Sequence, residues 1–265
     1  MPGDSRQRRA TATPLAVAGL WAALVLCLAS LAHAEVAQKD GVRVSIAGKM
    51  APTKLPRTGG APVAVSIAGH ITPTVPGALP KLEAISIALN SHGRLQTKGI
   101  PLCRLGHISP STTQEALLAC RPSLIGEGRF SANVRIPEQS PFPSDGKVLA
   151  FNGRLRGKPA LLAHIYGTEP IPTSYVLPFT ISRTAGTYGT VLEASLPQVT
   201  GEWGYVTGVE LDLRRGFAEA GCAAPQGFSS AVFPLLRTRF SFAGGPSVSS
   251  TLVRTCQVER KGMSR

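Results

Sequence analysis

Hydrophobic residues recur at alternate positions through most of this chain. The pattern is almost identical in Val42–Gly48 and Val63–Gly69, which read VRVSIAG and VAVSIAG, and it returns more loosely in Ala84–Leu89, which reads AISIAL. Alternate side chains of an extended strand point to opposite faces, so Val and Ile gather on one face while Ser and Ala gather on the other. The sequence therefore predicts three strands, each with one branched apolar face and one face of small side chains.

The face of small side chains carries little charge. We expect it to be covered by another layer or to lie flat against a partner, because an antiparallel sheet face in open water is usually rich in polar and charged residues. The first two segments also share a following Pro-Thr, at Pro52-Thr53 and Pro73-Thr74, which is consistent with a duplicated hairpin. Two copies are too few to indicate a solenoid or a propeller.

Further strands follow the same alternation, and a single helix interrupts them. Ser109–Cys120 begins with cap-forming residues and ends before Pro122, which predicts a short helix. Asn152-Gly153 is a dipeptide typical of a two-residue hairpin turn. The later predicted strands are 129–136, 148–151, 161–166, 175–181, 190–196, 205–213, 232–242 and 251–258.

Many short strands, turn signals roughly every 8–15 residues and one short helix predict an all-β fold. We expect an antiparallel β-sandwich of the Greek-key or jelly-roll kind, with residues 35–258 as a single domain. The stretch 168–172 is the best candidate for an internal boundary, in which case two smaller sandwiches would result. Residues 259–265 read as a basic tail.

Residues 1–34 have the pattern of an export signal. Three arginines precede an apolar run at 14–32, and Ala32-His33-Ala34 is a small-x-small cleavage motif before Glu35. We expect cleavage near Ala34, a secreted or cell-envelope location, and no stable membrane span afterwards. An uncleaved membrane anchor is the alternative, since the apolar run approaches the length of a bilayer span. The choice between the general secretory route and twin-arginine export stays open.

Removing the leader takes away three arginines and one aspartate, which leaves 25 basic and 14 acidic residues and a formal charge of +11 in place of +13. A strongly basic exported protein attracts anionic cell-wall polymers or polysaccharides, whereas export makes nucleic acid a poor physiological partner. Arg129 and Arg135 alternate with apolar residues on one predicted strand. They are the candidate anion-binding residues.

Four cysteines remain after the leader: Cys103, Cys120, Cys222 and Cys256. An even number in an exported chain predicts two disulfides, for which three pairings exist. Cys103 with Cys120 and Cys222 with Cys256 are favoured, because each pair brackets one compact local segment. No C-x2-C spacing and no cluster of histidines occurs, so we expect neither a metal site nor a cofactor.

No catalytic motif stands out in the sequence. Gly-x-Ser-x-Gly is absent, and the carboxylates cannot be paired from sequence. The leading hypothesis is a non-catalytic binding or structural module with a basic surface for anionic polymers. The alternative is a carbohydrate-active enzyme such as a polysaccharide lyase acting on acidic glycans, with His164 and Tyr166 on one strand face as the catalytic candidates. The ligand and the oligomeric state stay open.

Overall fold

A computed structural model describes residues 34–75, 79–136, 138–196 and 204–259. The expected leader, apart from Ala34, and the basic tail beyond Glu259 lie outside the described residues. Contacts group the chain from Ala34 onward into one compact unit. Among the helices in the described part, none is long and apolar enough to cross a membrane.

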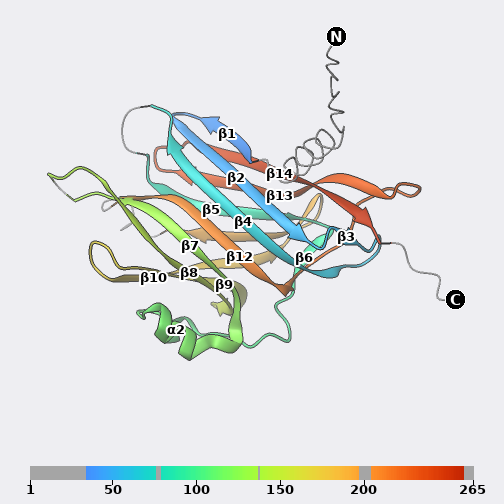
Figure 1. Cartoon of the computed structure of the whole chain (residues 1–265), viewed down its shortest axis with the longest axis horizontal. Coiled ribbons are helices and arrows are strands. Elements are labelled where there is room, and N and C mark those ends of the chain that lie inside the picture. Colours follow the sequence, from blue (N-terminus) through green and yellow to red (C-terminus); the bar gives the residue numbers. More distant parts are fainter. Residues whose placement is uncertain (1–33, 76–78, 137, 197–203, 260–265) are drawn as a thin grey trace, which may run out of the picture. The chain divides into compact units, whose positions relative to one another are not determined.

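The fold is dominated by a single sheet of 14 strands, drawn in Figure 1. Its neighbouring strands follow the order β1-β2-β4-β12-β7-β8-β9-β10-β11-β5-β13-β14-β3, and β6 pairs with β12. The strands are β1 (Glu35–Lys39), β2 (Val42–Ala51), β3 (Lys54–Leu55), β4 (Ala61–Pro73), β5 (Leu82–Asn90), β6 (Gly93–Leu95), β7 (Leu124–Val134), β8 (Phe142–Leu155), β9 (Lys158–Gly167), β10 (Thr173–Arg183), β11 (Tyr188–Ser195), β12 (Gly204–Ala220), β13 (Ser230–Phe242) and β14 (Ser247–Val258).

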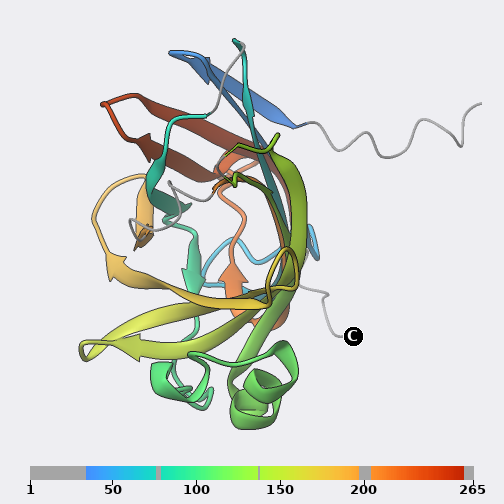
Figure 2. The same cartoon turned by 90° about the vertical axis from the view of Figure 1, so that its left-hand side faces the viewer.

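The sheet curls strongly around its core, as Figures 1 and 2 show from two directions. Every pair of neighbouring strands is antiparallel except β3 with β14. The prediction of an all-β protein with one short helix is confirmed. The finer expectation of two stacked sheets needs correction, because the strands form one continuous hydrogen-bonded sheet that packs against itself by curling.

The predicted apolar faces form the inner, concave side of the sheet. Val44 and Ile46 of β2 are almost fully buried and join a cluster with Leu236 and Phe240 of β13, although β2 and β13 are not neighbours in the sheet. This contact across the interior replaces the contact between two sheets of a sandwich. A second cluster fills the inner side of β8, β9 and β11.

The predicted helix begins four residues later than the sequence suggested. α2 (Thr113–Cys120) is capped by Thr112, whose hydroxyl accepts a hydrogen bond from the Glu115 N–H while the Glu115 carboxylate accepts one from the Thr112 N–H. α2 covers the outer face of β8 and β9, where Leu149 and Leu162 pack beneath it. The short 3-10 turns η1 (Leu105–His107) and η2 (Arg121–Ser123) flank it.

Both predicted disulfides are confirmed. Cys103 joins Cys120 and fixes the end of α2 to the segment before η1, and Cys222 joins Cys256 of β14 within a separate apolar cluster. The predicted closing hairpin of β13 and β14 is also present. The candidate boundary at 168–172 is the connection between β9 and β10, which pair along eight residue positions.

The predicted hairpin turn at Asn152-Gly153 is wrong. Both residues lie inside β8, and the turn to β9 is made by Arg156 and Gly157, whose φ angles are +50° and +81°. Asn152 is fully buried, and its Nδ2 donates to the carbonyl oxygens of Ile100 at 2.9 Å and of Thr97 at 3.1 Å. Its amide therefore anchors the segment that leads to Cys103.

The three similar strands have different neighbours. β2 and β4 pair with each other in antiparallel register, so that Ala47 lies opposite Ala68. β5 lies between β11 and β13 on the far side of the sheet. The outward face of β5, made of Ala84, Ser86 and Ala88, forms part of the site described next.

Candidate functional site

The lyase candidates His164 and Tyr166 share the outer face of β9, as predicted. The side chain of His164 is fully buried beneath the segment that leads into α2. Its Nε2 lies 2.9 Å from the carbonyl oxygen of Ser111, and its Nδ1 is buried with no hydrogen-bond partner among the described residues. Burial lowers the pKa of His164 from its ordinary value, although the hydrogen bond to Ser111 opposes the shift.

Tyr166 is half-buried and borders a small pocket of about 470 Å³ between α2 and β8. Lys147 and Asp145 of β8 border the same pocket. His164 is absent from its lining, and neither ring nitrogen of His164 is at a surface. A catalytic base must reach the proton that it removes from the substrate. The buried imidazole of His164 does not reach the pocket that Tyr166 borders, so the two residues do not form one catalytic site.

The predicted anion-binding residues Arg129 and Arg135 lie in different surroundings. Arg129 Nη2 is 2.8 Å from Glu210 Oε2 of the neighbouring strand β12, and this carboxylate raises the pKa of Arg129. Arg135 is exposed but lies just beyond the end of β7. The charge of Arg129 is thus already compensated, and the two arginines do not share a cavity.

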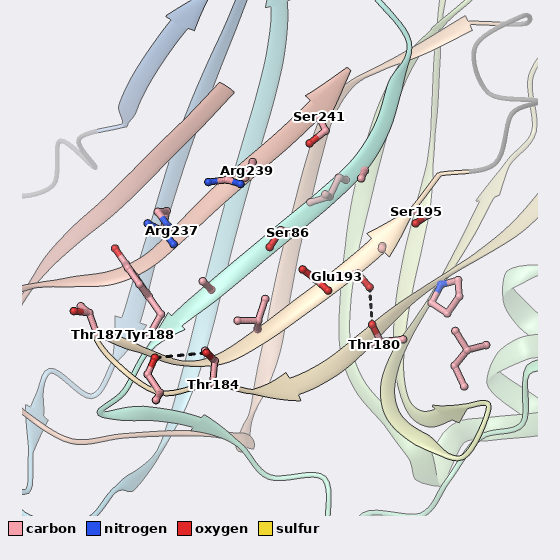
Figure 3. Close-up of a pocket in the computed structure, with 18 of the residues that line it drawn as sticks. Ser86, Thr180, Thr184, Thr187, Tyr188, Glu193, Ser195, Arg237, Arg239 and Ser241 are labelled. Atoms are coloured by element: carbon pink, nitrogen blue, oxygen red, sulfur yellow. Dashed lines mark hydrogen bonds between the residues drawn. The ribbon is translucent and has the colours of Figure 1, made fainter. Parts of the chain in front are cut away.

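A larger groove lies elsewhere, on the outer face of β5, β10, β11 and β13 (Figure 3). Its volume is about 1020 Å³. Cross-strand pairing places Ser86 of β5 between Glu193 of β11 and Arg239 of β13. The adjacent outward position of β5, Ala88, is paired with Arg237 of β13. The outward side chains of β5 are small, whereas Glu193, Arg237 and Arg239 on the neighbouring strands are long, and this difference in length hollows the surface over β5.

Arginine supplies the positive charge of this groove. Arg237 and Arg239 are exposed, and two residues along a strand correspond to about 6.6 Å. The guanidinium carbon of Arg237 lies 4.7 Å from the centre of the Tyr188 ring, which holds the cation over an aromatic face. Arg156, from the turn between β8 and β9, also borders the groove. Within the described part of the chain, none of these three arginines forms an ion pair.

Hydroxyl groups account for much of the remaining lining. Figure 3 shows Ser86, Thr180 and Ser195 around Glu193, and the hydroxyl of Thr180 donates to the backbone carbonyl oxygen of Glu193 at 3.2 Å. The carboxylate of Glu193 itself has no ion pair in the described ranges. The other hydroxyl-bearing residues of the lining are Thr184, Thr187, Tyr188 and Ser241.

Sequence reasoning missed this groove. The signal for its cationic side was present, since Arg237-Thr238-Arg239 in a predicted strand places two arginines on one face. The sequence did not indicate that β5 would lie beside β13, because Ser86 and its partner Arg239 are 153 positions apart and several other strands lie between them in the sequence. The long-range pairing, not the local pattern, creates the site.

The described residues contain no group of three or more His, Cys, Asp or Glu side chains that could hold a metal ion. Comparison with known proteins found no matching family model, no matching curated protein and no matching solved structure.

Proposed function

We propose that this protein is an exported, non-catalytic module of the cell envelope or extracellular space that binds an anionic polymer in the groove. The observation that carries the proposal is the pair Arg237 and Arg239, both exposed and free of ion pairs in the described part of the chain, beside a strand of small side chains. An uncompensated cation next to an open channel binds an anion without first breaking an internal ion pair.

The shape of the groove supports a polymer as the ligand. β5 offers Ala84, Ser86 and Ala88 in a row, which spans about 13 Å along the strand. An extended chain can lie along this row with its anionic groups directed at the arginines. The predicted export signal, the two disulfides and the formal charge of +11 after leader removal support an extracellular setting for such a ligand.

The first prediction compares two pairs of arginines. Arg237→Ala with Arg239→Ala is expected to weaken binding of the chain from Glu35 onward to polygalacturonate roughly tenfold, because two exposed ion pairs contribute about 0.2–1 kcal/mol each. Sedimentation or calorimetry measures the affinity, and repetition across a salt series tests the electrostatic component.

The matched control is Arg129→Ala with Arg135→Ala, which removes the same charge from the face predicted from the sequence. This control is expected to change the affinity less than about threefold, since Arg129 is already paired with Glu210. Equal losses in both double variants would mean that net charge alone drives binding, and the groove would lose its role. A larger loss of affinity in Arg129→Ala with Arg135→Ala than in Arg237→Ala with Arg239→Ala would place the anion-binding site at β7 instead.

The same assay addresses the lyase alternative. A lyase leaves an unsaturated sugar that absorbs ultraviolet light, whereas a binding module leaves the polymer intact. We expect no new absorbance during incubation, because the imidazole of His164 is buried and engaged with Ser111. New absorbance would require a catalytic base other than His164.

A further inference from the structure

One acidic residue, Glu193, lies within this mainly cationic groove. Cross-strand register places Glu193 and Arg239 on opposite sides of Ser86, so their Cα atoms are separated by two strand spacings, about 9.6 Å. The side chain of Glu193 is exposed, and among the described residues its carboxylate forms no ion pair. An exposed carboxylate in this position is a hydrogen-bond acceptor directed at whatever occupies the groove.

Three serines in the lining of the groove have unused hydrogen-bonding capacity. Within the described ranges, the hydroxyls of Ser86, Ser195 and Ser241 make no hydrogen bond to the protein. Register places Ser195 and Ser241 on either side of Ala84, two residues along β5 from Ser86. Hydroxyls of β5, β11 and β13 and the carboxylate of Glu193 thus line the groove together with the two exposed arginines of β13 (Figure 3).

We propose that the groove selects an acidic polysaccharide, in which each carboxylate is accompanied by free sugar hydroxyls, over a polyphosphate, whose backbone units carry anions but no free sugar hydroxyls. This inference rests on the proposed function. Sugar carboxylates pair with Arg237 and Arg239, while sugar hydroxyls donate to Glu193 and exchange hydrogen bonds with Ser86. A polyphosphate in the same place brings a negatively charged phosphate close to the carboxylate of Glu193, and the two like charges repel each other.

Charge arithmetic gives the expected size of the effect. Two like charges about 7 Å apart in water repel enough to change a binding constant about threefold, and the repulsion is stronger at the lower effective dielectric constant near a protein surface. Neutralising Glu193 should therefore tighten binding of a dense polyanion by about threefold or more. The same change should weaken a hydroxyl-bearing ligand, since hydrogen bonds to a charged acceptor are stronger than those to a neutral amide.

The test measures two probes against the chain from Glu35 onward: polygalacturonate and inorganic polyphosphate, matched in the concentration of anionic groups. The variant is Glu193→Gln, and Glu83→Gln provides the same charge change at an exposed position of β5 outside the groove lining. We expect the wild type to prefer polygalacturonate, and Glu193→Gln to reduce that preference about fivefold or more. Glu83→Gln should leave the preference unchanged.

Two results would overturn this inference: a wild type without preference for polygalacturonate, or an unchanged preference in Glu193→Gln. If Arg237→Ala with Arg239→Ala still weakens both probes in that case, the proposed anion-binding function survives and only the ligand class is wrong. If the double arginine variant binds both probes like the wild type, the proposed function fails and this inference fails with it.

Discussion

At the scale of single residues, His164 is a titratable side chain that is buried in the described part of the fold. Its imidazole is fully buried under Ser111, with Nδ1 unpartnered within the described residues. A neutral imidazole donates through Nε2 to the Ser111 carbonyl oxygen and leaves Nδ1 as an acceptor. Protonation would place a second N–H and a positive charge in a site with no acceptor for them, and that is costly in a buried setting.

This burial predicts a loss of stability in mild acid. Because the folded-state pKa of His164 is lowered from 6.5, the unfolded chain binds a proton at a higher pH than the folded protein does. The contribution to the free energy of unfolding is therefore complete above pH 6.5. It declines below pH 6.5, by at most about 1.4 kcal/mol per pH unit, until the folded-state pKa is reached.

Urea unfolding between pH 8 and pH 5 measures this dependence. His164→Gln keeps an amide donor for Ser111 but does not titrate, so its stability should fall less over this pH range than that of the wild type. The exposed His107 offers a control, and His107→Gln should follow the wild-type curve. Parallel curves for His164→Gln and the wild type would contradict the assignment.

Residue patterns predicted part of this chemistry. The alternation along the strand placed His164 and Tyr166 on one face, but it could not reveal that the segment leading into α2 covers His164. Asn152-Gly153 has the composition of a turn, yet Gly153 is needed for close packing: a Cβ there would lie 2.6 Å from Leu162 Cδ1 and 3.0 Å from the Cys103 carbonyl oxygen. The same dipeptide serves either purpose, and only the tertiary neighbours decide between them.

At the scale of elements, α2 is too short to persist alone. Helices shorter than about 12 residues are marginal in water, so the eight residues of α2 depend on their attachments. Those attachments are the Thr112–Glu115 capping box, the packing of Ala116 on the sheet and the disulfide from Cys120 to Cys103. The sequence predicted the helix and the disulfide because both join residues that are close along the chain. The hydrogen bonds from Asn152 to Thr97 and Ile100 join residues 55 and 52 positions apart, and the sequence did not indicate them.

Removing the disulfide should therefore loosen α2 in particular. Cys103→Ala with Cys120→Ala opens a bridge between residues 17 positions apart, and we expect a loss of about 3 kcal/mol in the free energy of unfolding. Hydrogen exchange of α2 should accelerate more than that of β8. In Cys222→Ala with Cys256→Ala, by contrast, α2 and β8 should change together. Equal protection of α2 with and without its disulfide would contradict this expectation.

At the scale of the whole unit, the alternating pattern predicted strands but not how their faces meet. One apolar face per strand is satisfied equally by two stacked sheets and by one sheet that curls until its ends approach. Val44 of β2 and Leu236 of β13 belong to one apolar cluster, and such a contact is compatible with both arrangements. The distinction depends on whether hydrogen bonding continues from β12 through β10 to β5, which involves pairings between residues far apart in sequence.

The curl brings β1 and β2 against β14, and side chains connect them. Glu35 of β1 accepts hydrogen bonds from the Val253 N–H at 3.1 Å and from Arg254 Nη1 at 2.8 Å, while Arg254 Nε donates to the Gly48 carbonyl oxygen at 2.7 Å. Gly48 allows this approach, because a Cβ there would lie 2.8 Å from Leu252 Cδ2 of β14. We call this contact the seam.

Glu35→Ala should weaken the seam without altering the groove. The change removes two hydrogen bonds to a charged acceptor, each about 1.5–3 kcal/mol, and solvent at the partly exposed pair reduces the loss, so we expect a decrease of about 2 kcal/mol in the free energy of unfolding. Hydrogen exchange should rise in β1 and in β14 near Val253. Affinity for polygalacturonate should stay within about twofold, since the seam lies outside the groove lining.

Lys39→Ala is the matched control, because Lys39 lies at the other end of β1 and its charged group is 3.8 Å from that of Asp40 in an exposed pair. It should change stability by less than about 0.5 kcal/mol. If Glu35→Ala behaved like Lys39→Ala, the seam would be held by apolar packing alone. The position of Glu35 also bears on maturation, since proposed cleavage after Ala34 keeps this carboxylate and cleavage one residue later removes it.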